Sequence, residues 1–248
     1  MARRLFMFLS MIVAASLALA AGAQEARKFA VLSLVGDSFM IVNHDATRAG
    51  EPPIIQRTVV DLPEHAFDNA LGTDVAAAVR QAAPRASVVN LAGAKALYAH
   101  EGELLEDPRP LLARVQPTVA SAGATHLVLV TKLLHRADVP LDAKAGEQSL
   151  IGLGFYLDPA APTGNRDAPA TAFLAPYAYF RVWLVDVGRQ RVVGYRDVAD
   201  ISPVTSGPSS TPQVWQSLSS AEKVKMVHSL AKDGAQAAVR ELVGNLPD

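Results

Sequence analysis

The chain contains no cysteine, and it begins with the pattern of a secretory signal peptide. Arg3 and Arg4 precede an apolar run over residues 5–19, and the small residues Ala21 to Ala23 supply a cleavage pattern. The run is short for a membrane span, which needs about 20 residues. We predict that residues 1–23 are removed; a retained N-terminal anchor is the alternative. An exported chain without cysteine forms no disulfide bonds, so the packing of a hydrophobic core must stabilise it.

The remaining chain, residues 24–248, is predicted to be a single periplasmic domain, because about 225 residues can bury a large core. Without Arg3 and Arg4 of the predicted signal peptide, the chain has 21 basic and 24 acidic residues. Nucleic acids and anionic membrane surfaces usually require a basic patch, so the charge argues against both as partners. The absence of cysteine excludes thiolate metal sites, thiol nucleophiles and the acylated cysteine of a bacterial lipoprotein. No later segment has about 18 consecutive apolar residues, so no further membrane span is expected.

Hydrophobic periodicity indicates alternating strands and helices. The predicted strands cover 28–42 (with a break at 36–38), 86–91, 125–135, 179–187 and 191–199. The predicted helices cover 64–83, 93–105, 110–122 and 217–243, and residues 43–57 are expected to form a loop. This order predicts an α/β or α+β fold: a mixed sheet of about five strands with flanking helices, a closing β-hairpin and a C-terminal helix.

Local patterns support three of these elements. Apolar residues recur every fourth position at Phe67, Leu71, Val75 and Val79, as one face of a helix requires. A glycine-containing turn at 188–190 separates two apolar strands and is typical of a hairpin. Either Ser219 or Ser220 is suited to begin the last helix as its N-cap.

Residues 137–177 interrupt the periodic pattern with glycines and prolines, and we predict a loop-rich insertion there. The insertion carries four aromatic residues that we predict to contact a partner: Phe155, Tyr156, Phe173 and Tyr177. Long loops without regular structure are usually functional or disordered, and disordered segments are poor in aromatic residues. The alternative is that the insertion only covers one end of the core.

Arg181 and Trp183 alternate on one face of the first hairpin strand and complete the predicted partner-binding set. Arginine and tryptophan dominate the binding energy of many interfaces, so this pair is a candidate interaction surface. The alternative places Trp183 in the core beneath the last helix.

Three stretches resemble the periplasmic α/β domain shared by the curli-secretion lipoproteins, the outer-membrane activators of penicillin-binding proteins, and the N-terminal domain of the Tol-Pal propeller protein. They are the opening strand at 29–34, the strand entry at 122–130 and the closing hairpin at 180–193. The resemblance implies a similar fold and binding of partners in the cell envelope without enzymatic activity. It transfers no functional residue. The chain departs from the first two families because it lacks their acylated cysteine.

Candidate chemistry is sparse in this sequence. Gly36-Asp37-Ser38 resembles the nucleophile block of GDS-type esterases, but the only late histidine, His228, lacks the aspartate three residues earlier that a triad of this type requires. Glu64, His65 and Asp68 have helical spacing, yet a metal site needs three or four converging ligands. We therefore predict no catalytic residue, no metal and no cofactor.

The sequence thus predicts a non-enzymatic, exported protein that binds another cell-envelope component. A periplasmic protein that binds a small molecule or lipid through the apolar insertion is the alternative. A GDS-type serine esterase is a distant third.

Overall fold

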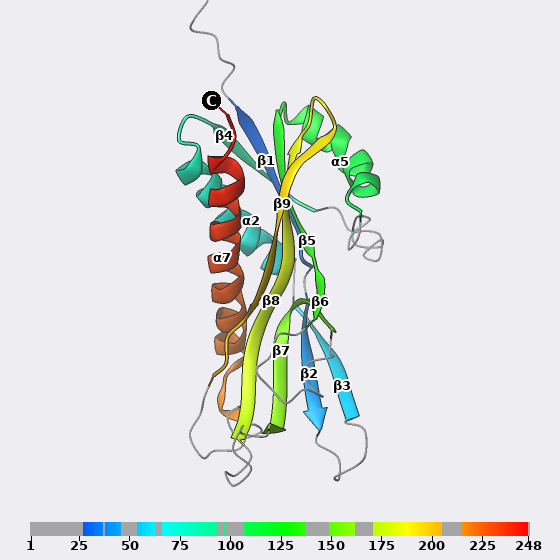
Figure 1. Cartoon of the computed structure of the whole chain (residues 1–248), viewed down its shortest axis with the longest axis vertical. Coiled ribbons are helices and arrows are strands. Elements are labelled where there is room, and N and C mark those ends of the chain that lie inside the picture. The colour runs from blue at the N-terminus through cyan, green and yellow to red at the C-terminus, as the bar shows by residue number, and fades with distance from the viewer. Residues whose placement is uncertain are drawn as a thin grey trace, which may run out of the picture.

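The structure, a computed structural model, describes residues 27–36, 38–45, 54–62, 66–93, 97, 107–136, 149–161, 171–204 and 215–247. These residues form one mixed sheet of nine strands with helices on both faces (Figure 1). The strands are β1 (Lys28–Leu34), β2 (Ser38–Asp45), β3 (Ile54–Asp61), β4 (Ser87–Leu91), β5 (His126–Lys132), β6 (Leu134–Arg136), β7 (Ser149–Ala161), β8 (Thr171–Asp186) and β9 (Arg191–Ile201). The helices are α2 (Ala66–Ala82), α5 (Arg109–Ser121) and α7 (Ser220–Gly244).

The predicted α/β class is confirmed, but the predicted strand number is wrong: the sheet has nine strands rather than about five. Two strands occupy positions where loops were expected: β3 begins in the predicted loop at 43–57 and continues to Asp61, and β7 lies within the insertion. Two predicted strands are each divided, into β1 and β2 and into β5 and β6. The predicted helix at 93–105 lies largely outside the described residues.

The long strand β8 organises the sheet. On one edge, β8 pairs with β7 up to Tyr179 and with β5 from Phe180 onward, and on the other edge it pairs with β9. The strand order is β3-β2-β7-β8-β5-β1-β4, with β6 added to β7. β1 is parallel to β4 and β5, and β2 is parallel to β7. The sheet therefore has two halves that share β8: one contains β5, β1 and β4, and the other contains β7, β2 and β3.

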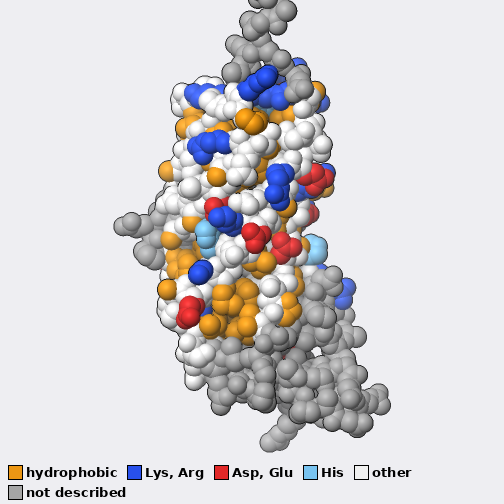
Figure 2. Space-filling view, turned by 90° about the vertical axis from the view of Figure 1, so that its left-hand side faces the viewer, with side chains coloured by type: hydrophobic (Ala, Val, Ile, Leu, Met, Phe, Trp, Pro, Cys, Tyr) orange, Lys and Arg blue, Asp and Glu red, His pale blue; other side chains and the backbone are white. Residues whose placement is uncertain are grey.

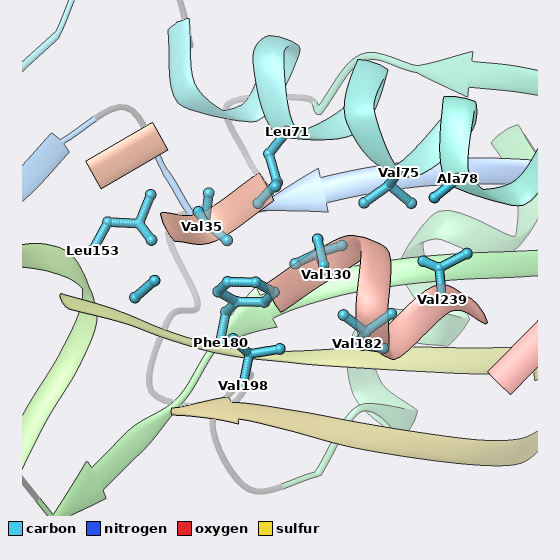
Figure 3. Close-up of a cluster of buried hydrophobic side chains, with 14 of the residues drawn as sticks. Val35, Leu71, Val75, Ala78, Val130, Leu153, Phe180, Val182, Val198 and Val239 are labelled. Atoms are coloured by element: carbon cyan, nitrogen blue, oxygen red, sulfur yellow. The ribbon is translucent and has the colours of Figure 1, made fainter. Parts of the chain in front are cut away.

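The larger core lies between the sheet and the helix pair α2 and α7. The predicted stripe of α2 is buried there, and Leu71 and Val75 approach Val130 and Phe180 of the sheet and Val239 of α7 (Figure 3). The outer surface of this side mixes acidic and basic side chains, with hydrophobic ones gathered toward one end (Figure 2). Such interspersed charges are typical of a solvated helix face.

The C-terminal helix begins as the sequence predicts. The Ser219 side chain accepts a hydrogen bond from the Glu222 backbone N–H (3.2 Å), and the Glu222 carboxylate accepts one from the Ser219 N–H (2.8 Å). This reciprocal capping box satisfies two donors that a helix start otherwise leaves unpaired. Gly234 then brings the α7 backbone against β9, because a Cβ at this position would overlap the side chain of Val198.

The opposite face of the sheet carries α5 over its β1–β5 half. The buried stripe of α5, Leu111, Val115 and Val119, packs on Leu127 and Leu129 of β5. The other half of this face carries a tyrosine cluster with a small apolar core of its own. Its buried members are Val42, Leu150, Tyr156, Tyr177 and Tyr179.

Candidate functional site

An apolar groove of about 230 Å³ opens between α5 and the β8–β9 hairpin. One flank of the helix forms the first wall and carries Arg109, Leu112, Ala113 and Gln116, which recur at helical spacing. The second wall comes from the hairpin, and the sheet supplies the floor. The remaining lining residues are Val115, Val119, Leu127, Val185, Val187 and Gln190.

The hairpin wall is held by hydrogen bonds at its turn. The backbone N–H of Val187 donates to the Thr125 carbonyl oxygen (3.0 Å), and the carboxylate of Asp186 accepts from the backbone N–H of Arg189 (2.9 Å). Gln190 closes the turn with a φ of 49°, a left-handed conformation that is uncommon for a non-glycine residue. The second wall is therefore fixed by the fold and not assembled by a ligand.

Two arginine–aspartate pairs lie near the groove. Arg109 contacts Asp107 at 2.9 Å at the start of α5, and Arg189 contacts Asp186 at 2.8 Å in the hairpin turn. The side-chain hydrogen bond from Arg109 lowers the pKa of Asp107, and the backbone hydrogen bond from Arg189 is the largest cause that lowers the pKa of Asp186. Both carboxylates therefore stay ionised at neutral pH, and the groove has an apolar interior beside a charged border.

The described lining of the groove carries few polar side chains. Among the described residues of the lining, the only polar side chains are those of Arg109, Gln116 and Gln190. An arginine keeps its proton at neutral pH, and a glutamine amide does not titrate. The described residues of the lining thus include no nucleophile and no group suited to general acid–base catalysis. The arrangement can bind apolar groups.

The structure places the predicted aromatic residues of the insertion in the interior. Phe155 is fully buried between Phe39 (ring centroids 6.0 Å apart) and Trp215 (5.1 Å apart), while Tyr156 and Tyr177 belong to the tyrosine cluster. Phe173 lies in β8, and its side chain is outside the described set. The expectation that these aromatic side chains form an outer surface is therefore wrong for Phe155, Tyr156 and Tyr177. The physical reason is that Phe155 and Tyr156 belong to β7 and Tyr177 to β8, two paired strands inside the sheet whose side chains are buried.

Arg181 and Trp183 come together as the sequence predicts, and a third residue, Tyr195, joins them. The guanidinium carbon of Arg181 lies 4.9 Å from the Trp183 ring centroid and 4.3 Å from that of Tyr195. Asp197 binds the same guanidinium (Nη2 to Oδ2 2.7 Å), and the Trp183 Nε1–H donates to Thr131 Oγ1 (3.0 Å). The hairpin pairing itself points to Tyr195, because it lies directly opposite Trp183.

Only part of this stack is accessible. Trp183 is buried beside the groove floor residue Val185, in the core under α5 rather than under the last helix. Tyr195 is 47% exposed. Arg181 is held against both rings, whose centroids are 5.2 Å apart, by its ion pair with Asp197. The stack therefore offers one exposed aromatic face on the same side of the sheet as the groove. Whether any residue of the predicted set contacts a partner stays a prediction.

The turn after β1 has a structural explanation that involves Asp68. This buried carboxylate accepts hydrogen bonds from the Ser33 hydroxyl (2.8 Å) and from the backbone N–H of Val35 (2.8 Å). Gly36 adopts a φ of 90° at this point, which suits a glycine. Asp37, Glu64 and His65 are outside the described residues. His228, the only late histidine, lies 2.9 Å from Asp74 across the α2–α7 contact.

Within the described ranges, no helix is long and apolar enough to cross a membrane. The proposed leader lies outside them, so the signal peptide stays a prediction.

No protein-family model matches the chain, and no curated protein matches its sequence. Among solved structures, protein XCC0632 from Xanthomonas campestris is similar at 13% identity and a TM-score of 0.36, over 88% of this chain and 81% of that one. The PelC dodecamer subunit from Paraburkholderia phytofirmans is similar at 10% identity and a TM-score of 0.29, over 88% and 86%. A putative neuraminyllactose-binding hemagglutinin homolog from Helicobacter pylori is similar at 6% identity and a TM-score of 0.38, over 91% and 85%.

These TM-scores are below 0.5, so the three likenesses carry no argument about what this chain does. All three proteins are bacterial, and none of their names refers to curli secretion, penicillin-binding-protein activation or the Tol-Pal system. The resemblance to those families therefore stays a prediction.

Proposed function

We propose that this chain is an exported, non-enzymatic protein that binds another component of the cell envelope in the groove between α5 and the β8–β9 hairpin. The observation that carries the proposal is the groove itself: an open, apolar concavity of about 230 Å³ whose walls are fixed by the fold. Anchor residues of a binding partner are typically accepted in pockets of this kind.

The volume of the groove favours a projecting segment of a partner over a complete small ligand. Pockets for drug-sized ligands usually enclose about 300–1,000 Å³. A dry cavity of about 150 Å³ accepts a benzene ring. A groove of about 230 Å³ therefore has room for one or two apolar side chains, and a whole lipid would leave most of its surface outside.

The chemistry of the lining supports binding without catalysis. Apolar side chains from α5 and the hairpin provide the contact area, and the described part of the lining adds only Arg109, Gln116 and Gln190 as polar side chains. The predicted signal peptide supports a site of action outside the cytoplasm.

A groove-filling substitution tests this function. The tagged full chain is expressed, cross-linked in intact cells and purified, as the wild type, as Ala113→Trp and as Ser121→Trp. Ala113 lines the groove, whereas Ser121 lies about 80° around α5 from it, away from the lining residues. Both positions are exposed, so neither tryptophan should unfold the protein.

We expect the wild type and Ser121→Trp to recover the same envelope protein, and Ala113→Trp to recover at least tenfold less. Equal recovery by all three proteins would contradict binding in the groove. Recovery of no protein, together with a small molecule that copurifies only with the wild type and Ser121→Trp, would favour the ligand-binding alternative.

A further inference from the structure

The edge strand β3 is a second candidate interaction surface, separate from the groove. It lies at the opposite end of the molecule from α5 (Figure 1). All eight residues of β3 pair with β2 in continuous register, and no other strand of the described chain pairs with β3. Most of its side chains are exposed, and two are large and apolar: Ile54 at 54% and Val59 at 56%.

Within the described part of the chain, β3 lacks several of the usual protections of a sheet edge. Natural edge strands are blocked by charged side chains, by proline, by β-bulges, by inward-pointing charges or by very short length, because an unpaired edge is a template for another strand. Of these devices β3 has the charged side chains Arg57 and Asp61, which a partner of complementary charge can pair. β3 has the sequence IIQRTVVD, which contains no proline, and its register with β2 has no shift. Its valines, isoleucines and threonine are also residues that favour strands.

We propose that β3 pairs antiparallel with β3 of a second copy of this chain, centred on Val59, so that the two sheets become continuous. A two-fold pairing of this kind is the commonest symmetry of homo-oligomers. Its register follows from the charges on the strand.

Residues directly opposite each other in an antiparallel pair lie on the same face of the sheet. Two-fold symmetry also places the same residue of both copies on the same face of the sheet. Residues opposite each other must therefore be an even number of positions apart in the sequence, so the symmetry axis passes through a single residue position of β3. A centre at Arg57 places two arginines opposite each other, and a centre at Asp61 places two aspartates opposite each other. Only a centre at Val59 places Arg57 opposite Asp61 of the second copy, and the symmetry produces this pair twice.

The side chains that this register joins are available. Arg57 and Asp61 are exposed, and neither has an ion-pair partner within the described part of the chain. Both lie on the same face as Val59, because the three residues occupy alternate positions of the strand and pair with alternate positions of β2. Opposite charges directly across two strands stabilise the pair, whereas like charges destabilise it. Pairing would also cover the exposed Val59 side chain with its counterpart.

Single-cysteine variants test the register, because the natural chain has no other thiol. The full chain is expressed as Val59→Cys or Ile54→Cys, purified, and oxidised with diamide. In the proposed pairing the Cα atoms of position 59 in the two copies are about 5 Å apart, within the range that a disulfide spans. The two copies of position 54 are about ten residues out of register and hence about 34 Å apart.

We expect Val59→Cys to form a disulfide-linked dimer at least tenfold faster than Ile54→Cys, although the two positions are almost equally exposed. Equal rates, or no dimer from Val59→Cys, would overturn the proposal. The difference between the two rates therefore distinguishes a pairing centred on Val59 from disulfide formation by random collision.

Charge exchange provides the second test, by sedimentation of otherwise cysteine-free protein. Arg57→Asp and Asp61→Arg each place like charges opposite each other, and each should reduce the dimer fraction at least tenfold at a fixed concentration. The double variant with both substitutions restores opposite charges and should recover the wild-type dimer fraction. Dimerisation that is unchanged in the single variants, or a wild type that sediments only as a monomer, would contradict the proposal. Circular dichroism checks that each variant is folded.

Discussion

The Asp68 carboxylate accepts a hydrogen bond from the Ser33 hydroxyl at 2.8 Å and thereby joins α2 to the end of β1. Both residues are buried, and the same carboxylate accepts the backbone N–H groups of Val35 and Gly36. A charged acceptor that satisfies several buried donors fixes where β1 ends and how α2 approaches the sheet.

Replacing Asp68 with alanine should therefore destabilise the fold strongly. The substitution leaves a hydroxyl and two backbone N–H groups buried without their acceptor, which should cost about 3 kcal/mol of unfolding free energy. Urea denaturation measures the effect. Ser33→Ala is the matched control, because it removes one donor only and should cost about 1 kcal/mol. Similar costs for the two variants would contradict the central role of Asp68.

Gly154 is a second position where the fold admits little change. A Cβ on Gly154 would overlap the carbonyl oxygen of Met40 and lie 2.6 Å from Cζ of Tyr177. We expect Gly154→Ala to lower the unfolding free energy by at least about 2 kcal/mol, as overpacking does. Gly188→Ala is the control, because its Cβ would meet only Asp186 at an ordinary 3.6 Å. A Gly154→Ala protein as stable as Gly188→Ala would show that β2 and β8 do not pack on β7 as described.

His126 should make stability depend on pH. Burial is the largest cause that lowers the pKa of this ring, and Arg27 also lowers it, whereas Asp186 acts in the opposite direction. Since the unfolded chain binds the proton more readily, the unfolded state is favoured as pH falls through about 6.5. Unfolding free energies at pH 7.5 and pH 5.5 should therefore differ more for the wild type than for His126→Gln. Equal pH dependence in both proteins would contradict the burial of this histidine against Phe29.

The Arg181 stack should contribute measurably to the hairpin. Arg181→Ala removes contacts with two aromatic rings and an ion pair with Asp197, and we expect a loss of about 1–2 kcal/mol. Arg191→Ala, an exposed arginine of the same hairpin without a partner in the described chain, should change stability by less than about 0.5 kcal/mol. Thermal or urea unfolding measures the loss of unfolding free energy in both variants. Equal losses would show that Arg181 contributes no more to stability than an exposed arginine.

The elements that the sequence predicted well carry their signal locally. The stripe of α2, the capping box of α7 and the glycine turn of the hairpin each depend on residues within a few positions of one another. The strands that were missed depend on distant contacts. β7 contains Gly152 and Gly154, which indicated a loop, yet Gly154 is required because Tyr177 and Met40 pack against it. β3 is an edge strand exposed on both faces, so it has no clear alternation of apolar and polar residues.

The candidate site was harder to predict than the fold. Arg181 and Trp183 were identified because they alternate along one strand, but their accessibility depends on α5, which lies elsewhere in the chain. The groove was missed altogether. It exists because α5 covers β1 and β5 while the hairpin extends beside it, and no short stretch of sequence encodes this lateral offset between two elements.

Site-specific photocross-linking from the groove tests the central claim most directly. A photoreactive residue is introduced at Ala113, which lines the groove, or at Ser121 on another side of the same helix, and the full chains are irradiated in living cells. If the groove receives a segment of an envelope partner, position 113 should yield one dominant cross-linked protein, and position 121 at least tenfold less. The same product in equal yield from both positions, or no product from either, would contradict the binding function proposed for the groove.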